Sequence, residues 1–371
     1  MTNFCGLGVT MSKVLGTWLL ALSVPFCSVA QATSVLFLNP GESTETFWVG
    51  YTQFMQAGAT DLGLDLRVQY AERQPATTLL QAREALQGPV RPDYLVVVNE
   101  QYVAPEILRL SQGSGVKLLL VNNTLTPDQL TLLGDRGRSH PELLGSVVAN
   151  DEEAGYRMLK ELVRLRERET PGEPIELLAF SGMKITPAAQ LREKGLYRAL
   201  AEHPNVRLRQ LVYGEWSRER AYEQARQLFG RYPQIQLVWS ANDEMALGAM
   251  QALEDTGRVP GKDVLFSAVN SSPAILQARI DGRLSVLMAG HFSIGGWAMV
   301  LLSDHAQGID FTRYGGQYQQ LPLLQLIDGR QARRLLDPGA SRHYDVDFKA
   351  LSAKGHAPGW RYPFSVQLLL R

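Results

Sequence analysis

From residue 34 onward the chain alternates between short apolar runs and longer stretches in which apolar residues recur at helical spacing. Short runs rich in Val, Ile and Leu are typical of strands buried on both faces, and amphipathic stretches indicate helices. The repeated strand–helix order predicts an α/β fold with doubly wound parallel sheets. In the first half, strands are expected at 35–38, 66–70, 94–98, 117–121 and 144–148, and helices at 47–62, 77–86 and 103–110.

A second series with the same order begins after a helix expected at 150–166. Residues 122–140 separate the two series, and their Asn, Pro and Gly content predicts a surface loop. A chain of 371 residues is long enough for two domains, so we expect each series to form one lobe with its own sheet. In the second lobe, strands are expected at 175–180, 206–212, 235–239, 264–268 and 284–288, and helices at 187–202, 217–229, 243–255 and 273–280.

The stretch 235–253 places a polar residue where a strand passes directly into a helix. Asn242 is a good N-cap, and Asp243 and Glu244 add negative charge to the first helical turn, where the helix dipole favours it. Open α/β sheets bind small molecules at this carboxyl edge of their strands. Asn242 is therefore a candidate ligand contact, and the alternative is that it only caps the helix.

Residues 239–249, Trp-Ser-Ala-Asn-Asp-Glu-Met-Ala-Leu-Gly-Ala, resemble a segment of the type I periplasmic binding proteins of the ribose-binding-like group. The resemblance implies two doubly wound parallel-sheet lobes joined by a three-segment hinge, with the ligand between the lobes. It assigns 33–149 and 291–323 to the N-terminal lobe, and 150–290 and 324–371 to the C-terminal lobe. Residues 328–371 exceed the ribose-binding pattern, and we expect this extension to pack on the second lobe.

The segment after the first strand, Asn-Pro-Gly-Glu-Ser-Thr-Glu-Thr-Phe-Trp, has a family counterpart in which an Asn and two Phe residues contact the sugar. By position, Glu45 replaces that Asn, and Phe47 and Trp48 replace the two Phe residues. A carboxylate accepts from adjacent hydroxyls or pairs with an amine, so Glu45 leaves solutes other than ribose open. The alternative for Phe47 and Trp48 is core packing at a helix start.

Asparagines follow two further strands of the first lobe. Asn99 occupies a position where the family commonly has Asn, whereas Asn122 and Asn123 stand where it has Asp-Arg. The resemblance makes all three candidate ligand contacts. The loss of the charged pair at 122–123 is a second departure from the ribose pattern.

The second lobe and the hinge supply the other candidates. Arg192 matches a family Arg that donates to ligand oxygens, and Trp216 matches an aromatic residue that stacks on the sugar ring. Asn270 stands where the family has Asp, and His291 lies near the family's hinge Gln. Together with Asn242, these residues complete a predicted site of aromatic faces, amides, one Arg and one Glu, which suits a sugar or related polyol.

Composition and motifs argue against other classes of function. Lys+Arg and Asp+Glu both number 37, so the chain has no basic excess that would attract nucleic acid. The sequence contains no Gly-x-Ser-x-Gly elbow, Walker loop or His-Glu-x-x-His helix, and its six histidines are scattered. We therefore expect a non-enzymatic protein without metal or cofactor.

The first 32 residues indicate export. Lys13 precedes the apolar run 14–26, and Ala30-Gln31-Ala32 is a small-x-small cleavage site, as in a cleavable signal peptide. Cleavage near Ala32 would remove Cys5 and Cys27, the only cysteines in the sequence. The alternatives, a membrane anchor or lipidation at Cys27, fit less well, because the run is short for a bilayer and the residues before Cys27 are bulky.

These observations predict a periplasmic solute-binding protein that captures a sugar or polyol between closing lobes and delivers it to an ABC transporter. The alternative is a periplasmic sensor, similar to the autoinducer-2 receptor, that reports to a membrane histidine kinase or diguanylate cyclase. The expected partners are thus a small polar solute and either an ABC permease or a membrane sensor protein. The protein itself is expected to be monomeric.

Overall fold

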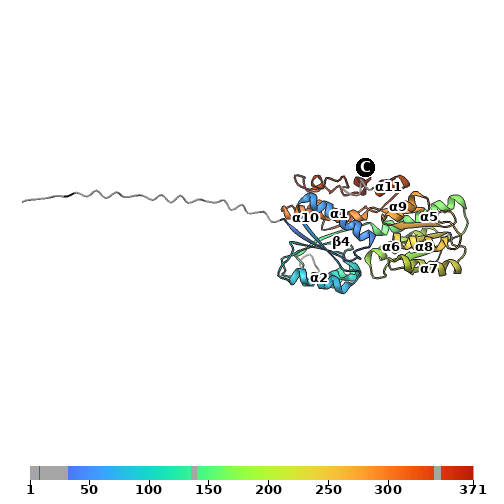
Figure 1. The fold of residues 1–371 in the computed structure, drawn as a ribbon, viewed down its shortest axis with the longest axis horizontal. Coiled ribbons are helices and arrows are strands. Elements are labelled where there is room, and N and C mark those ends of the chain that lie inside the picture. The colour runs from blue at the N-terminus through green and yellow to red at the C-terminus, as the bar shows by residue number, and fades with distance from the viewer. Residues whose placement is uncertain (1–7, 9–31, 135–139, 338–343, 371) are drawn as a thin grey trace, which may run out of the picture. The chain divides into compact units, whose positions relative to one another are not determined.

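The structure, a computed structural model, describes Gly8 and residues 32–134, 140–337 and 344–370. Ala32–Arg371 form one compact unit that contains two six-stranded sheets (Figure 1). The predicted signal peptide lies outside the described residues, apart from Gly8 and Ala32. Within the described part of the chain, no helix has the length and apolar character needed to cross a bilayer.

The first lobe is built on a parallel sheet with the strand order β11-β5-β4-β3-β1-β2. Alternate residues of its strands face opposite sides: Leu36 and Leu38 pack against one helical layer, and Val35 and Phe37 against the other. The helices α2 and α3 cover the first face, and α1 and α10 cover the second (Figure 1). The elements are β1 (Ser34–Asn39), α1 (Thr46–Leu62), β2 (Asp65–Tyr70), α2 (Pro75–Gln87), β3 (Tyr94–Val97), η1 (Glu100–Tyr102), α3 (Ala104–Ser111), β4 (Lys117–Asn122), α4 (Pro127–Leu132), β5 (Leu143–Ala149), α10 (Ile294–Ala306), η3 (Phe311–Tyr314) and β11 (Tyr318–Leu321).

The second lobe has the strand order β12-β10-β9-β8-β6-β7, and only β12 runs antiparallel to its neighbour. Its central strand β8 is tied to α5, because the buried Trp239 donates through Nε1 to the carbonyl of Gly155 at 3.1 Å. The elements are α5 (Asp151–Glu169), β6 (Ile175–Ser181), α6 (Pro187–Glu202), β7 (Val206–Tyr213), α7 (Arg218–Arg231), β8 (Leu237–Ser240), α8 (Asp243–Glu254), β9 (Leu265–Val269), α9 (Pro273–Ile280), β10 (Val286–Ala289), η2 (His291–Ser293) and β12 (Gln325–Leu326).

The predicted fold class is confirmed: two doubly wound α/β lobes are joined where β5 leads into α5, where β10 leads into α10, and where β11 leads into β12. Asn150 locks two of these crossings together. Its Nδ2 donates to the carbonyl of Leu324 at 3.2 Å, and its Oδ1 accepts from the Leu324 amide at 2.9 Å. The predicted loop 122–140 differs in one respect, because Thr126 and Gln129 form a capping box that starts the short helix α4.

The C-terminal extension follows a different path from the expected one. Its helix α11 (Gly329–Leu336) packs on α9 of the second lobe, as predicted. Tyr344, Phe348 and Phe364 instead pack on aromatic residues of α1 and α10 in the first lobe, and η4 (Lys349–Leu351) follows Phe348. The last turn, η5 (Val366–Leu369), lies near the hinge, where Gln367 Nε2 donates to Gln325 Oε1 of β12 at 2.7 Å. The prediction that the whole extension packs on the second lobe is therefore wrong, because Tyr344 contacts Phe54 of α1.

Asp304 on α10 anchors this extension. The carboxylate is fully buried and accepts from the Ser352 hydroxyl at 2.5 Å, the Ala353 amide at 2.7 Å and the Tyr362 hydroxyl at 2.7 Å. Phe364 stacks on Trp297 of the same helix, with the ring centroids 5.3 Å apart. The extension thus completes the core of the first lobe, because it covers an aromatic surface that α1 and α10 alone leave open.

Candidate functional site

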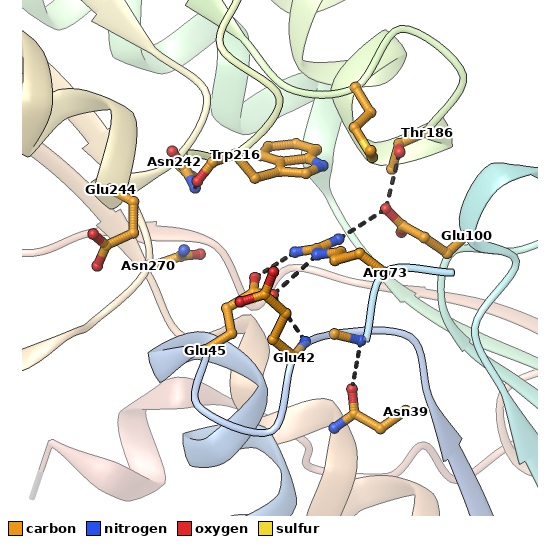
Figure 2. Close-up of polar contacts among 12 residues, drawn as sticks. Asn39, Glu42, Glu45, Arg73, Glu100, Thr186, Trp216, Asn242, Glu244 and Asn270 are labelled. Carbon is orange, nitrogen blue, oxygen red and sulfur yellow. Dashed lines mark hydrogen bonds and ion pairs between the residues drawn. The ribbon is translucent and has the colours of Figure 1, made fainter. Parts of the chain in front are cut away.

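The carboxyl ends of both sheets face a cavity between the lobes, and Figure 2 shows Trp216 and Asn242 of the second lobe opposite Arg73 and Glu45 of the first. All but one of the residues predicted from sequence line it. The lining consists of Glu45, Phe47, Trp48, Arg73, Glu100, Asn122, Asn123, Thr186, Ala188, Arg192, Trp216, Asn242, Asn270 and His291.

Trp48 of the first lobe and Trp216 of the second each pack directly against a glycine. A Cβ at Gly41 would lie 1.9 Å from the Trp48 ring, and one at Gly182 would lie 2.1 Å from the Trp216 ring, so any larger residue would displace the indoles. Trp216 has a positive φ of 68°, in the region that non-glycine residues rarely adopt, and this backbone holds the indole at the cavity. The Nε1 atoms of both indoles are buried without a partner among the described residues, so each can donate to a ligand.

Arg192 is buried and fixed by protein acceptors. Its Nε donates to the Asp151 carboxylate at 2.8 Å, and its Nη1 donates to the Ala241 carbonyl at 2.7 Å. Burial raises the pKa of Asp151, and the neighbouring guanidinium opposes this shift. The guanidinium also lies 5.9 Å from the Trp216 ring centroid, so Arg192 links the hinge helix α5 to the aromatic wall of the cavity.

Asn242 and Asn270 lie at the carboxyl edge of the second-lobe sheet. Asn242 is the N-cap of α8, because its Oδ1 accepts from the Met245 amide at 2.9 Å, while its Nδ2 donates to the Trp216 carbonyl at 3.1 Å. Asn242 therefore caps α8, and its second Nδ2 hydrogen stays available for a ligand. Asn270, at a φ of 103°, donates to Asp243 Oδ1 at 2.7 Å, and burial raises the pKa of Asp243.

The first-lobe wall contains two charged residues that the sequence analysis did not single out, Arg73 and Glu100. The Arg73 guanidinium binds both oxygens of Glu45, with the Nε–Oε2 distance 2.9 Å, and donates through Nη1 to Glu100 Oε1 at 3.1 Å. Burial raises the pKa of Glu45 despite the opposing charge of Arg73. Because Glu45 is already paired with Arg73, it is less free to hold a ligand amine than its sequence position indicates.

The three asparagines of this lobe that were predicted as ligand contacts differ in whether they line the cavity. Asn122, at a φ of 62°, and Asn123 both line the cavity. Asn99 does not: its Nδ2 donates to the Thr124 carbonyl and to Gln129, both at 2.8 Å, and its Oδ1 accepts from the Ala104 amide at 3.0 Å. Asn99 is therefore a structural residue that ties the loop after β4 to α3, and its assignment as a ligand contact is wrong.

His291 lies at the hinge and stacks on Phe47, with the ring centroids 4.7 Å apart. Its Nε2 is 3.4 Å from Arg192 Nη2, and its Nδ1 is buried without a partner among the described residues. Because Arg192 can only donate, Nε2 is the acceptor and Nδ1 carries the proton. Burial, with the charge of Arg192 as the second cause, holds the pKa of His291 well below its ordinary value, so the ring is a neutral donor.

Acidification tests this assignment. Below about pH 6.5 the unfolded chain protonates His291 and the folded protein does not, so the free energy of unfolding falls by up to roughly 1.4 kcal/mol per pH unit from this residue. Urea unfolding of the wild type and of His291→Asn, at about pH 7.5 and about pH 5, should show a smaller loss in the variant. His356→Asn, at an exposed position, should behave like the wild type. Equal losses in all three proteins would show that His291 titrates normally.

A second, larger cavity of about 710 Å³ lies between α1, α9 and the C-terminal extension. Most of its lining is apolar, including Leu276, Leu335, Leu351 and Leu368. Its lining also includes Gln53, Arg334, Asp345 and Asp347, but Phe47 is the only predicted ligand contact among the residues that line it. We therefore place the ligand site between the lobes. Within the described residues, no group of three or more His, Cys, Asp or Glu side chains could hold a metal ion.

Two α/β lobes that meet at a hinge, with a polar and aromatic cavity between their carboxyl edges, define a two-lobed ligand-binding protein. Residues 35–310 match the model of the periplasmic binding protein domain, and the chain belongs to this family. The ribose import binding protein of Escherichia coli K12 is 26% identical over 270 residues, which are 72% of this chain and 83% of that protein.

Solved structures agree with this assignment. A crystal structure of a periplasmic sugar-binding protein from Pseudomonas fluorescens is similar at 64% identity and a TM-score of 0.85, and the match covers 91% of this chain and all of that one. The binding-protein component of the arabinose ABC transporter from Shewanella sp. ANA-3, bound to L-arabinofuranose, matches at 20% identity and a TM-score of 0.69, over 85% of this chain and 99% of that one. The second likeness shows the fold alone.

Proposed function

We propose that this protein is an exported solute-binding protein that captures a sugar or related polyol and delivers it to an ABC transporter. The observation that carries the proposal is the cavity itself, in which aromatic faces and hydrogen-bonding groups from both lobes converge. Indole faces suit the C–H faces of a sugar ring, while amides and a guanidinium satisfy its hydroxyl groups. No covalent chemistry is required of these residues, so the ligand leaves unchanged.

Hinge motion couples capture to release. Direct hydrogen bonds join the lobes across the cavity, including Ala188 N to Asn123 Oδ1 at 3.0 Å and Gln190 Nε2 to the Tyr102 hydroxyl at 2.6 Å. A ligand that contacts both lobes stabilises this closed arrangement, and a membrane permease can distinguish it from the open one. The names of the relatives above, which refer to sugar import and sugar binding, support transport over the sensor alternative.

The proposal includes the cellular location and the oligomeric state of the protein. The Lys13 charge, the apolar run 14–26 and the Ala30-Gln31-Ala32 site support a signal peptide cleaved near Ala32, which directs the chain to the periplasm. A monomer suffices, because one chain supplies both walls of the cavity.

A thermal-shift screen against sugars, polyols, amino acids and autoinducer-2 identifies the ligand class, since a ligand at about a hundred times its Kd stabilises the folded protein by about 2.7 kcal/mol. A shift with amino acids and none with sugars or polyols would overturn the sugar assignment.

Trp216→Ala should weaken the affinity for the sugar found in this screen by roughly tenfold or more, because the variant loses the stacking face and a buried Nε1 donor. Isothermal titration measures the effect. Trp360→Ala, a matched change in the C-terminal extension away from the cavity lining, should leave the affinity unchanged. Identical titration curves for the wild type and Trp216→Ala would show that the sugar does not lie between the lobes.

A further inference from the structure

Glu100 is a buried carboxylate that receives hydrogen bonds from both lobes. It lies at the start of η1, and only 6% of its surface is exposed. Its Oε1 accepts from Arg73 Nη1 at 3.1 Å and from the Thr186 hydroxyl at 3.0 Å (Figure 2). Its Oε2 accepts from Asn123 Nδ2 at 3.0 Å. Arg73 and Asn123 belong to the first lobe, whereas Thr186 precedes α6 of the second. Separation of the lobes therefore removes one donor from a desolvated charge.

Arg73 reaches the cavity because the loop after β2 adopts an unusual backbone. Glu72 and Arg73 have φ angles of 49° and 59°, and two consecutive non-glycine residues in this region are unfavourable. The loop is held by Glu72 N to the Gly41 carbonyl at 3.1 Å and Arg73 N to the Pro40 carbonyl at 3.0 Å. The strained loop thus delivers the guanidinium to the cavity wall rather than to solvent.

The guanidinium connects the cavity to Glu100. Three of its five N–H groups donate to Glu45 and Glu100, which leaves two for an acceptor in the cavity that Arg73 lines. A ligand hydroxyl that accepts from Arg73 restricts the guanidinium further. The restricted guanidinium in turn keeps Glu100 in the orientation in which Thr186 reaches it.

We propose that Glu100 is a positioning residue that couples ligand capture at Arg73 to closure of the lobes through Thr186. Asn123 works in the same direction, since its Nδ2 donates to Glu100 while its Oδ1 accepts from the Ala188 amide of the second lobe at 3.0 Å. The carboxylate is buried in the closed arrangement, where an unsatisfied charge is unfavourable, so closure depends on the donors that Thr186 and Asn123 supply. The inference rests on the proposed function, because the ligand is taken to be the sugar of the cavity.

Thr186→Val and Glu100→Gln test the coupling with little change of shape. Thr186 makes no side-chain capping bond to α6, so the valine removes only the hydroxyl bond to Glu100. Stopped-flow measurement with the sugar should show a dissociation rate constant raised about tenfold in each variant, with the association rate constant changed by less than about twofold. The two effects should be less than multiplicative in the double variant, because both changes weaken one shared set of hydrogen bonds around Glu100.

Matched controls separate this effect from general damage. Thr60→Val on α1 and Glu84→Gln on α2 make the same chemical changes at exposed positions, and both rate constants should stay at the wild-type values. A merely structural role of Glu100 would alter both rate constants together. Wild-type dissociation rates in Thr186→Val, or effects of the two changes that multiply in the double variant, would overturn the coupling.

A ligand-free measurement distinguishes failure of the coupling from failure of the proposed function. Small-angle X-ray scattering without sugar should give a larger radius of gyration for Thr186→Val and Glu100→Gln than for the wild type. The first variant loses the bond between the lobes, and the second loses the charge and one of the two acceptor oxygens on which the donors of both lobes converge. Equal radii would overturn the coupling whatever the ligand is. A wild type that binds no sugar, together with larger radii in the variants, would refute the sugar assignment and leave the closure device supported.

Discussion

Replacing Arg192 with alanine is expected to lower the free energy of unfolding by about 3–5 kcal/mol and to abolish ligand binding. The side chains of Arg192 and Asp151 are each only 4% exposed, so the substitution leaves a desolvated carboxylate without its counter-charge. It also removes the bond to the Ala241 carbonyl at the end of β8 and the contact with His291. Urea unfolding followed by circular dichroism gives the stability, and isothermal titration of the folded variant gives the affinity.

The helix α6, which carries Arg192, contains a second arginine that serves as a control. Arg198 on α6 pairs with Glu152 and Glu153 of α5, but its side chain is 42% exposed. Exposed ion pairs contribute about 0–1 kcal/mol, so Arg198→Ala should unfold close to the wild type and bind the sugar normally. Coincident unfolding curves for the two variants would mean that the buried pair at Asp151 does not hold α5 against α6.

Asp304→Ala should destabilise the protein by about 3 kcal/mol or more and free the C-terminal extension for proteolysis. The variant leaves the Ser352 hydroxyl, the Ala353 amide and the Tyr362 hydroxyl without their common acceptor, and each unsatisfied buried donor costs about 1–3 kcal/mol. Burial, with Asp304 as the second cause, raises the pKa of Tyr362, so its hydroxyl remains a donor at neutral pH.

Limited trypsin digestion measures the release of the extension, since Lys349, Lys354 and Arg361 are exposed cleavage sites within it. Cleavage at these sites should become much faster in Asp304→Ala. Tyr362→Phe removes one of the three bonds and should produce an intermediate effect in both unfolding and digestion. If Asp304→Ala resists trypsin as well as the wild type does, the extension is held by its aromatic contacts instead.

The sequence predicted the architecture well because periodicity and local motifs encode it. The helices 187–202 and 273–280 begin and end where the structure has them, and Asn242 lies at the predicted junction of strand and helix. Most of the candidate site also follows from position, because residues after parallel strands meet at one edge whatever their side chains are. The resemblance then selected the residues at that edge.

The errors have a common physical origin in contacts between distant segments. Asn99 follows a strand as a ligand residue would, but its amide is used by Thr124 and Gln129, which lie in a segment that looked like an unstructured loop. Arg73 was missed because its direction depends on two unusual φ angles that no residue type in the loop signals. The extension was misplaced because aromatic residues indicate burial without indicating which surface they cover.

The late position of the C-terminal extension in the sequence affects the order in which the two lobes are completed during synthesis. The second lobe obtains nearly all of its sheet from 175–289. The first lobe, in contrast, needs α10 on one face of its sheet and β11 at the edge. It also needs the hydrogen bonds that Ser352, Ala353 and Tyr362 donate to Asp304. A growing chain therefore carries an incomplete first lobe, with exposed apolar surface, until Tyr362 has been added. The two lobes thus become complete at different times during synthesis, and the lobe that begins first in the sequence is the later one to be finished.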